Sequence, residues 1–505
     1  MRIKAAAAGI LLAGQALANE PLAAIDWLNQ PQPRSDLPGT VLLEPPVTGT
    51  AALPPVSVTP LETLLPPIGL VPPSATGLPA DLWRGSNAAE IAHLIETVPV
   101  RRSPAMQALL FTLLLSETRP PATAKDRILL ARLDRLLALG ATDPSQALAE
   151  HAGPTVSKAR FKRWFAATLL TGSEDKPCAA LTASPYLSDD YATQIFCTAR
   201  RGDWPTAALM LETAHALGLL PQAQMELLDR FLNPDLFELA APLRRPANPD
   251  PLTFRLFETI GEPMPTAPLP PAFAAADLRD IAGWKAQLEA AERLARGGAL
   301  NPNQYLGLFS ARKPAASGGI WDRVAAVQRL ESDLASGSAE ALARSLPRAW
   351  DAMQQAGTET VFADLFAEPL AQTPLTGPAE ALAWRIRLLS PLYELAAHDA
   401  RPSGAEEQFL AALAQGRPAD AAAPTQTAEA ISLGFSAPPP VPPEIRQLLD
   451  NGQLGEAILR SMMLFSRGAD GNLGDLTSAL ASFRAVGLED TARRAALQLM
   501  LLERQ

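Results

Sequence analysis

The sequence lacks the residue patterns that mark common catalytic and metal sites. In 505 residues it has two cysteines, and it contains no Gly-x-Ser-x-Gly, no His-Glu-x-x-His and no phosphate-binding Gly-x-x-x-x-Gly-Lys-Ser/Thr. The two cysteines have no histidine nearby and so supply too few ligands for zinc. We therefore predict no catalytic residue, no metal and no cofactor. The four histidines are far apart, and each lies in or beside a predicted helix: His93, His151, His215 and His398.

Basic clusters are also missing. The formal net charge is −10 at pH 7. Binding to nucleic acid requires lysines and arginines that neutralise phosphates, and attraction to anionic lipid has the same requirement. We expect neither as a partner.

Long hydrophobic runs are rare. The run Ala5 to Leu17 follows Arg2 and Lys4 and is too short to span a bilayer, which needs about 20 residues. It has the form of a signal peptide over residues 1–18, with Ala16-Leu17-Ala18 as a cleavage signal cut after Ala18. We expect a mature periplasmic protein without a transmembrane segment.

The two cysteines, Cys178 and Cys197, are 19 positions apart. In an oxidising compartment an even, close pair favours a disulfide. Two buried free thiols are the alternative.

Proline is abundant near the start, with pairs such as Pro45-Pro46 and Pro54-Pro55. Proline blocks helices and central strands, so we expect residues 19–85 to form a disordered segment with polyproline II character. Because short apolar stretches recur between the prolines, this segment is either a tether or a strip that docks on a partner or on its own domain.

The rest of the chain shows helical periodicity. The stretch DRILLARLDRLLALGA (126–141) places Leu129, Leu133 and Leu136 on one face and leaves Arg132 off it. Strand-like alternation is scarce. We predict an all-α protein, an irregular α-solenoid of antiparallel helix pairs similar to tetratricopeptide repeats. The expected parts are helical blocks at 86–245, 272–416 and 444–505, a proline-rich crossover at 246–271 and a proline-rich linker at 417–443.

Two stretches share a repeat pattern. Residues 201–209, RGDWPTAAL, and 451–459, NGQLGEAIL, both read Gly, a large apolar residue, Ala and Leu at the same spacing. Glycine permits the tight turn between two helices, and the alanine lets a neighbouring helix approach. The pattern predicts that Trp204 belongs to the core. Arg200 and Arg201 would then form the polar end of a helix, with an anion site as the alternative.

One stretch has the composition of a recognition surface. Residues 300–323 combine aromatic side chains, basic residues and a Ser-Gly-Gly turn, a mixture common at interfaces. The alternative is an ordinary inter-helix turn with aromatic packing. The candidate recognition patch consists of Tyr305, Phe309, Arg312, Lys313 and Trp321.

Two weaker signals concern chemistry. Ser173 to Lys176 matches Ser-x-x-Lys but has no Lys-Thr-Gly partner, so we do not assign it as a nucleophile. Asp189 and Asp190 are better explained as a cap of the following helix than as a catalytic pair.

The exported start, the proline-rich lead and two helical stretches carry a family resemblance. The stretches are FCTARRGDWPTAALMLETAHALG (196–218) and LASFRAVGLEDTARRAALQLMLLERQ (480–505). The chain resembles uncharacterised exported Ala/Leu/Pro-rich proteins of alphaproteobacteria, some named as antifreeze glycopeptide-related. It is loosely similar to tetratricopeptide proteins and to the superhelical segment of soluble lytic transglycosylases, but it has no glutamate-serine catalytic motif. The resemblance implies no activity and no catalytic residue.

Together these observations predict a non-enzymatic periplasmic scaffold that binds an envelope protein. One alternative is a protein that binds or cleaves envelope glycan, using separated carboxylates such as Asp189, Asp190 or Glu238. Cleavage would require two carboxyl groups about 5 to 9.5 Å apart. The other alternative is an accessory of a secretion or flagellar machine. The sequence does not indicate the oligomeric state.

Overall fold

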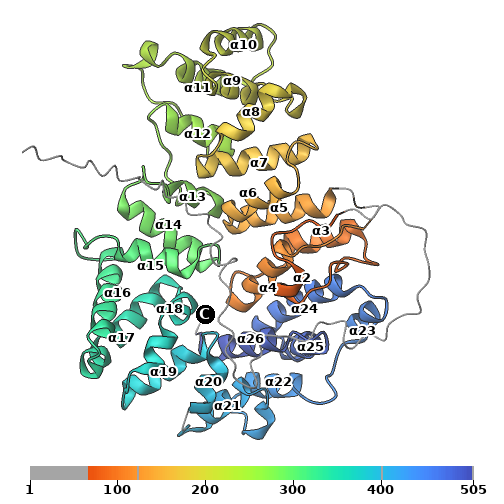
Figure 1. The fold of residues 1–505 in the computed structure, drawn as a ribbon, viewed down its shortest axis with the longest axis vertical. Coiled ribbons are helices and arrows are strands. Elements are labelled where there is room, and N and C mark those ends of the chain that lie inside the picture. The colour runs from red at the N-terminus through yellow and green to blue at the C-terminus, as the bar shows by residue number, and fades with distance from the viewer. Residues whose placement is uncertain (1–65, 122–123, 125, 400–401, 503–505) are drawn as a thin grey trace, which may run out of the picture. The chain divides into compact units, whose positions relative to one another are not determined.

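The fold is all-helical in the part of the chain that the structure, a computed structural model, describes: residues 66–121, 124, 126–399 and 402–502 (Figure 1). The predicted signal peptide and most of the proline-rich segment lie outside these residues. Helices adjacent in sequence pack in pairs, as predicted. The first half contains α2 (Pro73–Thr76), α3 (Ala88–Thr97), α4 (Pro104–Leu115), α5 (Arg127–Leu139), α6 (Thr142–His151), α7 (Lys158–Thr171), α8 (Asp175–Ala183), α9 (Tyr191–Arg200), α10 (Trp204–Ala216), α11 (Gln222–Leu232) and α12 (Pro251–Thr259).

The second half of the described chain is also helical. Short 3-10 turns precede or follow several helices in both halves. Its helices are α13 (Ala274–Asp277), α14 (Trp284–Arg296), α15 (Pro302–Ser310), α16 (Ile320–Ala335), α17 (Ala339–Ala356), α18 (Glu359–Gln372), α19 (Pro378–Leu388), α20 (Tyr393–Asp399), α21 (Ala405–Ala414), α22 (Gln426–Gly434), α23 (Pro443–Asp450), α24 (Leu454–Ala469), α25 (Leu473–Ala485) and α26 (Glu489–Leu501). The 3-10 turns are η2 (Pro185–Leu187), η3 (Pro234–Phe237), η4 (Pro271–Phe273) and η5 (Pro418–Asp420).

Local sequence signals set many of the helix ends. The Ser103 side chain accepts a hydrogen bond from the Met106 N–H at the start of α4, and Pro104 occupies the first turn. A serine cap satisfies a free N–H, and proline costs nothing there because its missing donor would be unpaired anyway. Gly202 and Gly452 form the predicted turns of the repeat with φ of 90° and 73°. Residues with a Cβ rarely adopt this left-handed conformation.

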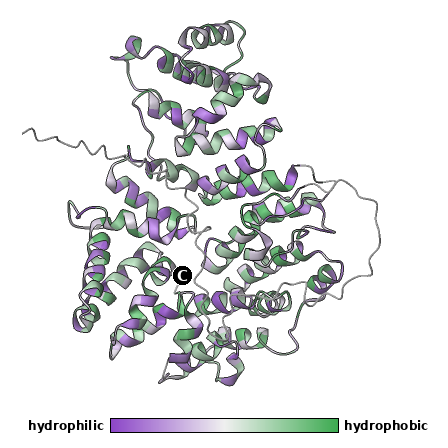
Figure 2. Cartoon of the chain, viewed as in Figure 1, coloured by the Kyte–Doolittle hydropathy of each residue, from purple (hydrophilic) through white to green (hydrophobic). Residues whose placement is uncertain are grey.

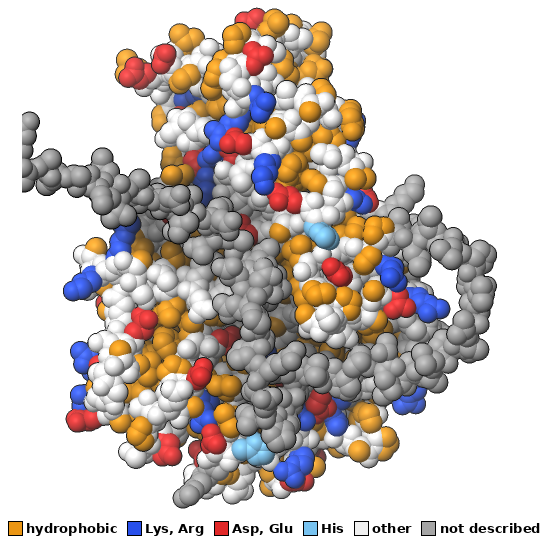
Figure 3. All heavy atoms as spheres, in the orientation of Figure 1, with side chains coloured by type: hydrophobic (Ala, Val, Ile, Leu, Met, Phe, Trp, Pro, Cys, Tyr) orange, Lys and Arg blue, Asp and Glu red, His pale blue; other side chains and the backbone are white. Residues whose placement is uncertain are grey.

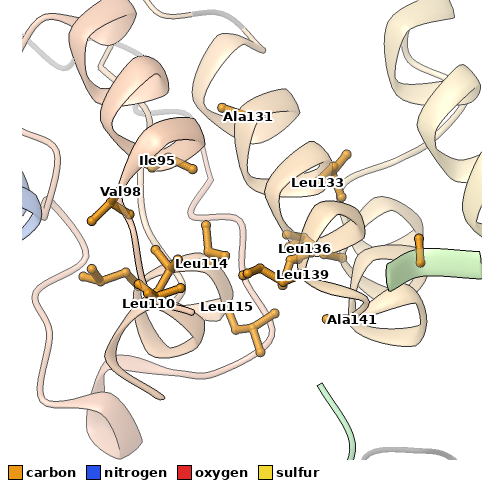
Figure 4. Packing of buried hydrophobic residues seen from close by; sticks show 14 of the residues in the cluster. Ile95, Val98, Leu110, Leu114, Leu115, Ala131, Leu133, Leu136, Leu139 and Ala141 are labelled. Atoms are coloured by element: carbon orange, nitrogen blue, oxygen red, sulfur yellow. The ribbon is translucent and has the colours of Figure 1, made fainter. Parts of the chain in front are cut away.

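Two clusters of buried apolar side chains form the core. The larger joins helices from both ends of the described chain, and the smaller is built mainly by residues 274–389. Most helices carry apolar and polar stretches in alternation (Figure 2). Near α3, α4 and α5 apolar side chains of the three helices converge (Figure 4). The labelled residues there are Ile95, Val98, Leu110, Leu114, Leu115, Ala131, Leu133, Leu136, Leu139 and Ala141.

Helices far apart in sequence also pack together. Helix α24 lies against α3, and α26 lies against α4. The Gln498 side chain in α26 accepts a hydrogen bond of 2.7 Å from the backbone N–H of Ala105. In an open solenoid each repeat contacts only its neighbours. Here the C-terminal helices also cover the N-terminal ones.

The predicted disordered segment 19–85 extends too far. Residues 66–85 are ordered: Ile68 pairs with Thr118 and Val71 with Ser116 in isolated β-bridges, and α2 follows. The Leu82 and Trp83 side chains are fully buried. Proline interrupts helix interiors and central strands, but it does not prevent the residues between prolines from packing. For this reason the disordered segment was predicted to extend too far.

The two later proline-rich stretches also contain helices. Helix α12 lies within 246–271, and α22 lies within the predicted linker 417–443. In α22 the Ala428 and Ile431 side chains are fully buried against the main core. Proline at a first turn starts a helix, as Pro251 does in α12, so a high proline content did not mean a linker.

Candidate docking surface around α10

The cysteines stabilise the base of the region around α10. Cys178 in α8 and Cys197 in α9 form a disulfide with an S–S distance of 2.02 Å, as their spacing predicted. Both side chains are buried. A loop of this length contributes about 3 kcal/mol in the chain-entropy model. Helix α9 is therefore a firmly held support for α10, which packs on it.

A balanced group of charges lies beneath α10. Glu174 is fully buried, and its Oε1 accepts hydrogen bonds of 3.0 and 2.9 Å from Nε and Nη2 of Arg255. Nε of Arg200 lies 3.4 Å from the same oxygen and 3.2 Å from Oδ1 of Asp175. Two arginines thus face two carboxylates. Arg200 is neutralised within the chain, which favours the predicted polar helix end over an anion site.

Helix α10 itself is poorly covered. Only Ala207, Leu211 and Ala214 are buried among its thirteen residues. Leu209 is 63% exposed and Leu217, which follows the helix, is 66% exposed. The prediction that Trp204 belongs to the core is wrong, because its side chain is 45% exposed. It packs by one side on Phe231, with ring centroids 5.6 Å apart.

More apolar side chains are exposed next to α10. Leu219 follows α10, and Leu236 and Leu239 lie in and after the 3-10 turn η3, which packs on α11. Leu239 is 99% exposed. Hydrophobic side chains are visible over the region of α10 and α11 at the top of Figure 3. Clustered apolar side chains of this size mark interaction sites more often than single exposed leucines do. We call Trp204, Leu209, Leu217 and Leu219 the α10 face.

The second copy of the repeat shows what such a helix looks like when covered. Leu459 in α24 occupies the position of Leu209 and is fully buried. Helix α24 packs against α3, α23 and α25, whereas the main described neighbours of α10 are α9 and α11. The same repeat position is therefore core in one copy and surface in the other.

A pocket opens beside the α10 face. Its volume is about 170 Å³, and it lies between α9, the first residue of α10, and the ends of α11 and α12. Three of its eight lining residues are aromatic. The lining residues are Glu174, Phe196, Ala199, Arg200, Gly202, Trp204, Phe231 and Thr259.

The recognition patch predicted at 300–323 does not form as expected. Tyr305 and Phe309 are fully buried and stack on each other with centroids 4.3 Å apart. Burial raises the pKa of Tyr305, with a smaller contribution from the charge of Glu292. These two residues are therefore core, contrary to the prediction, because α15 is amphipathic and turns them inward. Arg312 and Lys313 are exposed, and half-buried Trp321 packs on Trp284 at 5.2 Å.

No contact joins the carboxylates considered for glycan cleavage among the described residues. Asp189 and Asp190 each contact other groups instead. Asp189 pairs with Lys158 at 2.6 Å, and both oxygens of Asp190 accept backbone N–H groups at the start of α9. Glu238 is exposed. The Ser173 hydroxyl bonds to Gln146 and Thr171. Within the described ranges no group of histidine, cysteine and acidic side chains is arranged to hold a metal ion.

A second, larger pocket has a polar lining and volume of about 600 Å³. It runs from the start of α3 to Asp134 of α5 and Arg163 of α7, which pair at 2.6 Å. It has no aromatic wall among its described residues, so it lacks the aromatic anchors on which interfaces concentrate their binding energy.

Comparisons with protein-family models, with curated proteins and with solved structures found no match for this chain. The resemblance to exported alphaproteobacterial proteins therefore stays a prediction. Among the described helices, none combines the length and the apolar character needed to cross a membrane.

Proposed function

We propose that this protein is a non-enzymatic helical-repeat scaffold of the bacterial periplasm that binds a protein partner through the α10 face. The observation that carries the proposal is the exposure of Leu209 in α10 and of Leu217 directly after it, whereas Leu459, the repeat counterpart of Leu209, is buried. Burying such leucines against a partner is favourable by about 25 cal/mol per Å² of apolar surface. The disulfide and the signal-peptide-like start support a periplasmic location.

The α10 face has the composition of a protein interface. It combines one half-exposed aromatic residue, Trp204, with exposed leucines. Interfaces concentrate their binding energy in such aromatic anchors. Ion pairs such as Arg200 with Asp175 keep the surrounding charges balanced, so the apolar contact dominates.

Crosslinking from a single position tests the proposal. The photoreactive amino acid p-benzoylphenylalanine replaces Leu209 in cells that naturally make the protein, and crosslinked proteins are identified by mass spectrometry. We expect one specific partner, lost when Leu217→Asp is added. Val156, which is 68% exposed after α6, is the matched control position and should not capture that partner. Identical products from both positions, or none from Leu209, would refute the assignment of this face.

Location is tested separately. We expect the protein in the periplasmic fraction, with Asn19 as its first residue by N-terminal sequencing. A mature protein that still begins at Met1 in the cytoplasm would contradict the periplasmic part of the proposal.

A further inference from the structure

The pocket beside the α10 face has the size of one aromatic ring. Its volume of about 170 Å³ is close to that of an engineered apolar cavity, about 150 Å³, that binds benzene. Phe196 and Phe231 stack with centroids 5.6 Å apart, and Trp204 packs on Phe231 at the same distance. Aromatic rings attract one another in offset and edge-to-face arrangements, so a further ring fits such walls.

Charge favours a neutral occupant. The ionised groups at the pocket are already paired within the chain: Arg200 and Arg255 with Glu174 and Asp175. Oε2 of Glu174 has no hydrogen-bond partner among the described residues, but it is shielded from solvent. The Thr259 hydroxyl donates to the carbonyl of Leu256. A charged occupant would lose its hydration without gaining an unpaired counter-charge.

The C-terminal copy of the repeat already places an aromatic side chain at a helix entry. The backbone N–H of Gly455, in the first turn of α24, donates to the carbonyl of Leu82 at 3.0 Å. A Cβ on Gly455 would lie 2.5 Å from the ring of Trp83, which is fully buried. A distant part of the chain thus supplies the aromatic group there. At the entry of α10 a pocket lies beside Gly202 and Trp204.

We propose that this pocket holds one uncharged aromatic side chain of the protein partner, phenylalanine in its simplest form. The rest of the partner segment lies along Leu209 and Leu217, which are 63% and 66% exposed. This inference rests on the proposed function, because it names the anchor residue class of that same interface.

Toluene, the phenylalanine side chain without its backbone, is the probe. Calorimetric titration of the whole mature protein should show saturable binding, and a crystal soaked in toluene should show it between Trp204 and Phe231. Benzylammonium and benzoate carry the same ring with opposite charges and should bind at least about tenfold more weakly. Equal binding of all three, or no toluene binding, overturns the proposal.

Two variants localise the site. Ala199→Leu adds three carbon atoms from the α9 wall of the pocket and should weaken toluene binding at least about tenfold. If this buried change prevents folding, Trp204→Ala carries the test, because its side chain is nearly half exposed. Unchanged toluene affinity in the folded variants overturns the pocket assignment.

The partner experiment separates the two proposals. A crosslink from position 209 that persists in both Ala199→Leu and Trp204→Ala overturns the aromatic anchor. The assignment of the α10 face as the docking site is then unaffected. Loss of the crosslink in these variants, with retained helicity, supports the anchor. Absence of any crosslink in the otherwise unchanged protein overturns the docking face, whatever toluene does.

Discussion

Arg132 shows how a buried cation can be satisfied without a carboxylate. It is 2% exposed, although the helical pattern of 127–139 left it off the apolar face. Its guanidinium donates to the carbonyls of Leu114, Ser116 and Ile68 at 2.6, 2.8 and 2.9 Å. Two of these acceptors lie at the C-terminal end of α4, where carbonyls lack partners and the helix dipole is negative. Burial lowers its pKa to about 10, which leaves it charged at neutral pH.

We expect Arg132→Lys to lower the free energy of unfolding by about 1.5 to 3 kcal/mol, because one ammonium cannot reach three carbonyls from the same position. Urea denaturation followed by circular dichroism measures this. Arg127→Lys, an exposed change at the start of the same helix, should stay within about 0.5 kcal/mol of the unchanged protein. Equal effects of the two substitutions would contradict the role assigned to Arg132.

Asp126 supplies a pH-dependent contact near the same helix. Burial opposes its ionisation, but hydrogen bonds from Arg160 and the charge of that guanidinium outweigh burial and lower the pKa of Asp126 below 3.8. Its Oδ1 lies 2.6 Å from Nη2 of Arg160. The folded state therefore binds its proton less readily than the unfolded state does. The resulting stabilisation is present above pH 3.8 and is lost as pH falls through the lowered pKa.

We expect Asp126→Asn to lower the free energy of unfolding by about 1.5 to 3 kcal/mol at pH 7, the range for hydrogen bonds to charged groups. The difference from the unchanged protein should shrink below pH 3.8, as both carry a neutral side chain at 126. Urea titrations at a series of pH values measure it. A difference that stays constant down to pH 2 would show that the ion pair with Arg160 does not stabilise the fold.

At the scale of single helices, α10 and α24 share a sequence pattern but differ in their surroundings. Gly202 and Gly452 make the same turn, and Ala207 and Ala457 are both fully buried. The following leucines differ because α24 has α3 and α25 beside it. A local pattern specifies that a helix turns and packs on its partner. It does not specify what covers the opposite face.

Substitution at this shared position should destabilise the protein strongly in α24 and hardly at all in α10. Leu459→Ala removes a fully buried side chain, and we expect a loss of about 2 to 5 kcal/mol. Leu209→Ala removes an exposed one and should change stability by no more than about 0.5 kcal/mol. Thermal and urea unfolding compare the pair directly. If the two losses were alike, Leu209 would be covered in solution, and the α10 face would not be free for a partner.

At the scale of the whole described chain, contacts between helices from opposite ends distinguish this protein from a linear array. Helix α26 packs on α4, and the hydrogen bond from Ala105 to Gln498 joins residues 393 positions apart. Arg460 of α24 pairs with Glu90 of α3 at 2.8 Å. The N-terminal helices therefore depend on the C-terminal ones for part of their burial.

Removal of residues 489–505 should expose the covered side of α4. We expect faster hydrogen exchange in α4 than in the full-length protein and unchanged exchange in α10, whose main described neighbours are α9 and α11. Mass spectrometry of peptic fragments measures both regions in one experiment. Equal acceleration throughout would indicate a single cooperative unit, and no change in α4 would mean that α26 contributes nothing to its stability.

The sequence by itself determined the helical class, because apolar periodicity, capping residues and glycine turns are local signals, read over a few residues. It also indicated the Cys178–Cys197 disulfide, since an even, close pair of cysteines in an oxidising compartment favours a disulfide. For the candidate site it indicated the helix turn at Gly202 that precedes α10, but it expected Trp204 in the core.

Only the tertiary structure decided which apolar side chains are covered. Tyr305 and Phe309 were predicted as surface recognition residues and are buried, while Trp204 was predicted as core and is 45% exposed. Burial depends on whether a distant element lies over a helix face, as α3 lies over α24 and no described helix lies over Leu209. That information is spread over residues hundreds of positions apart, and a local pattern does not contain it.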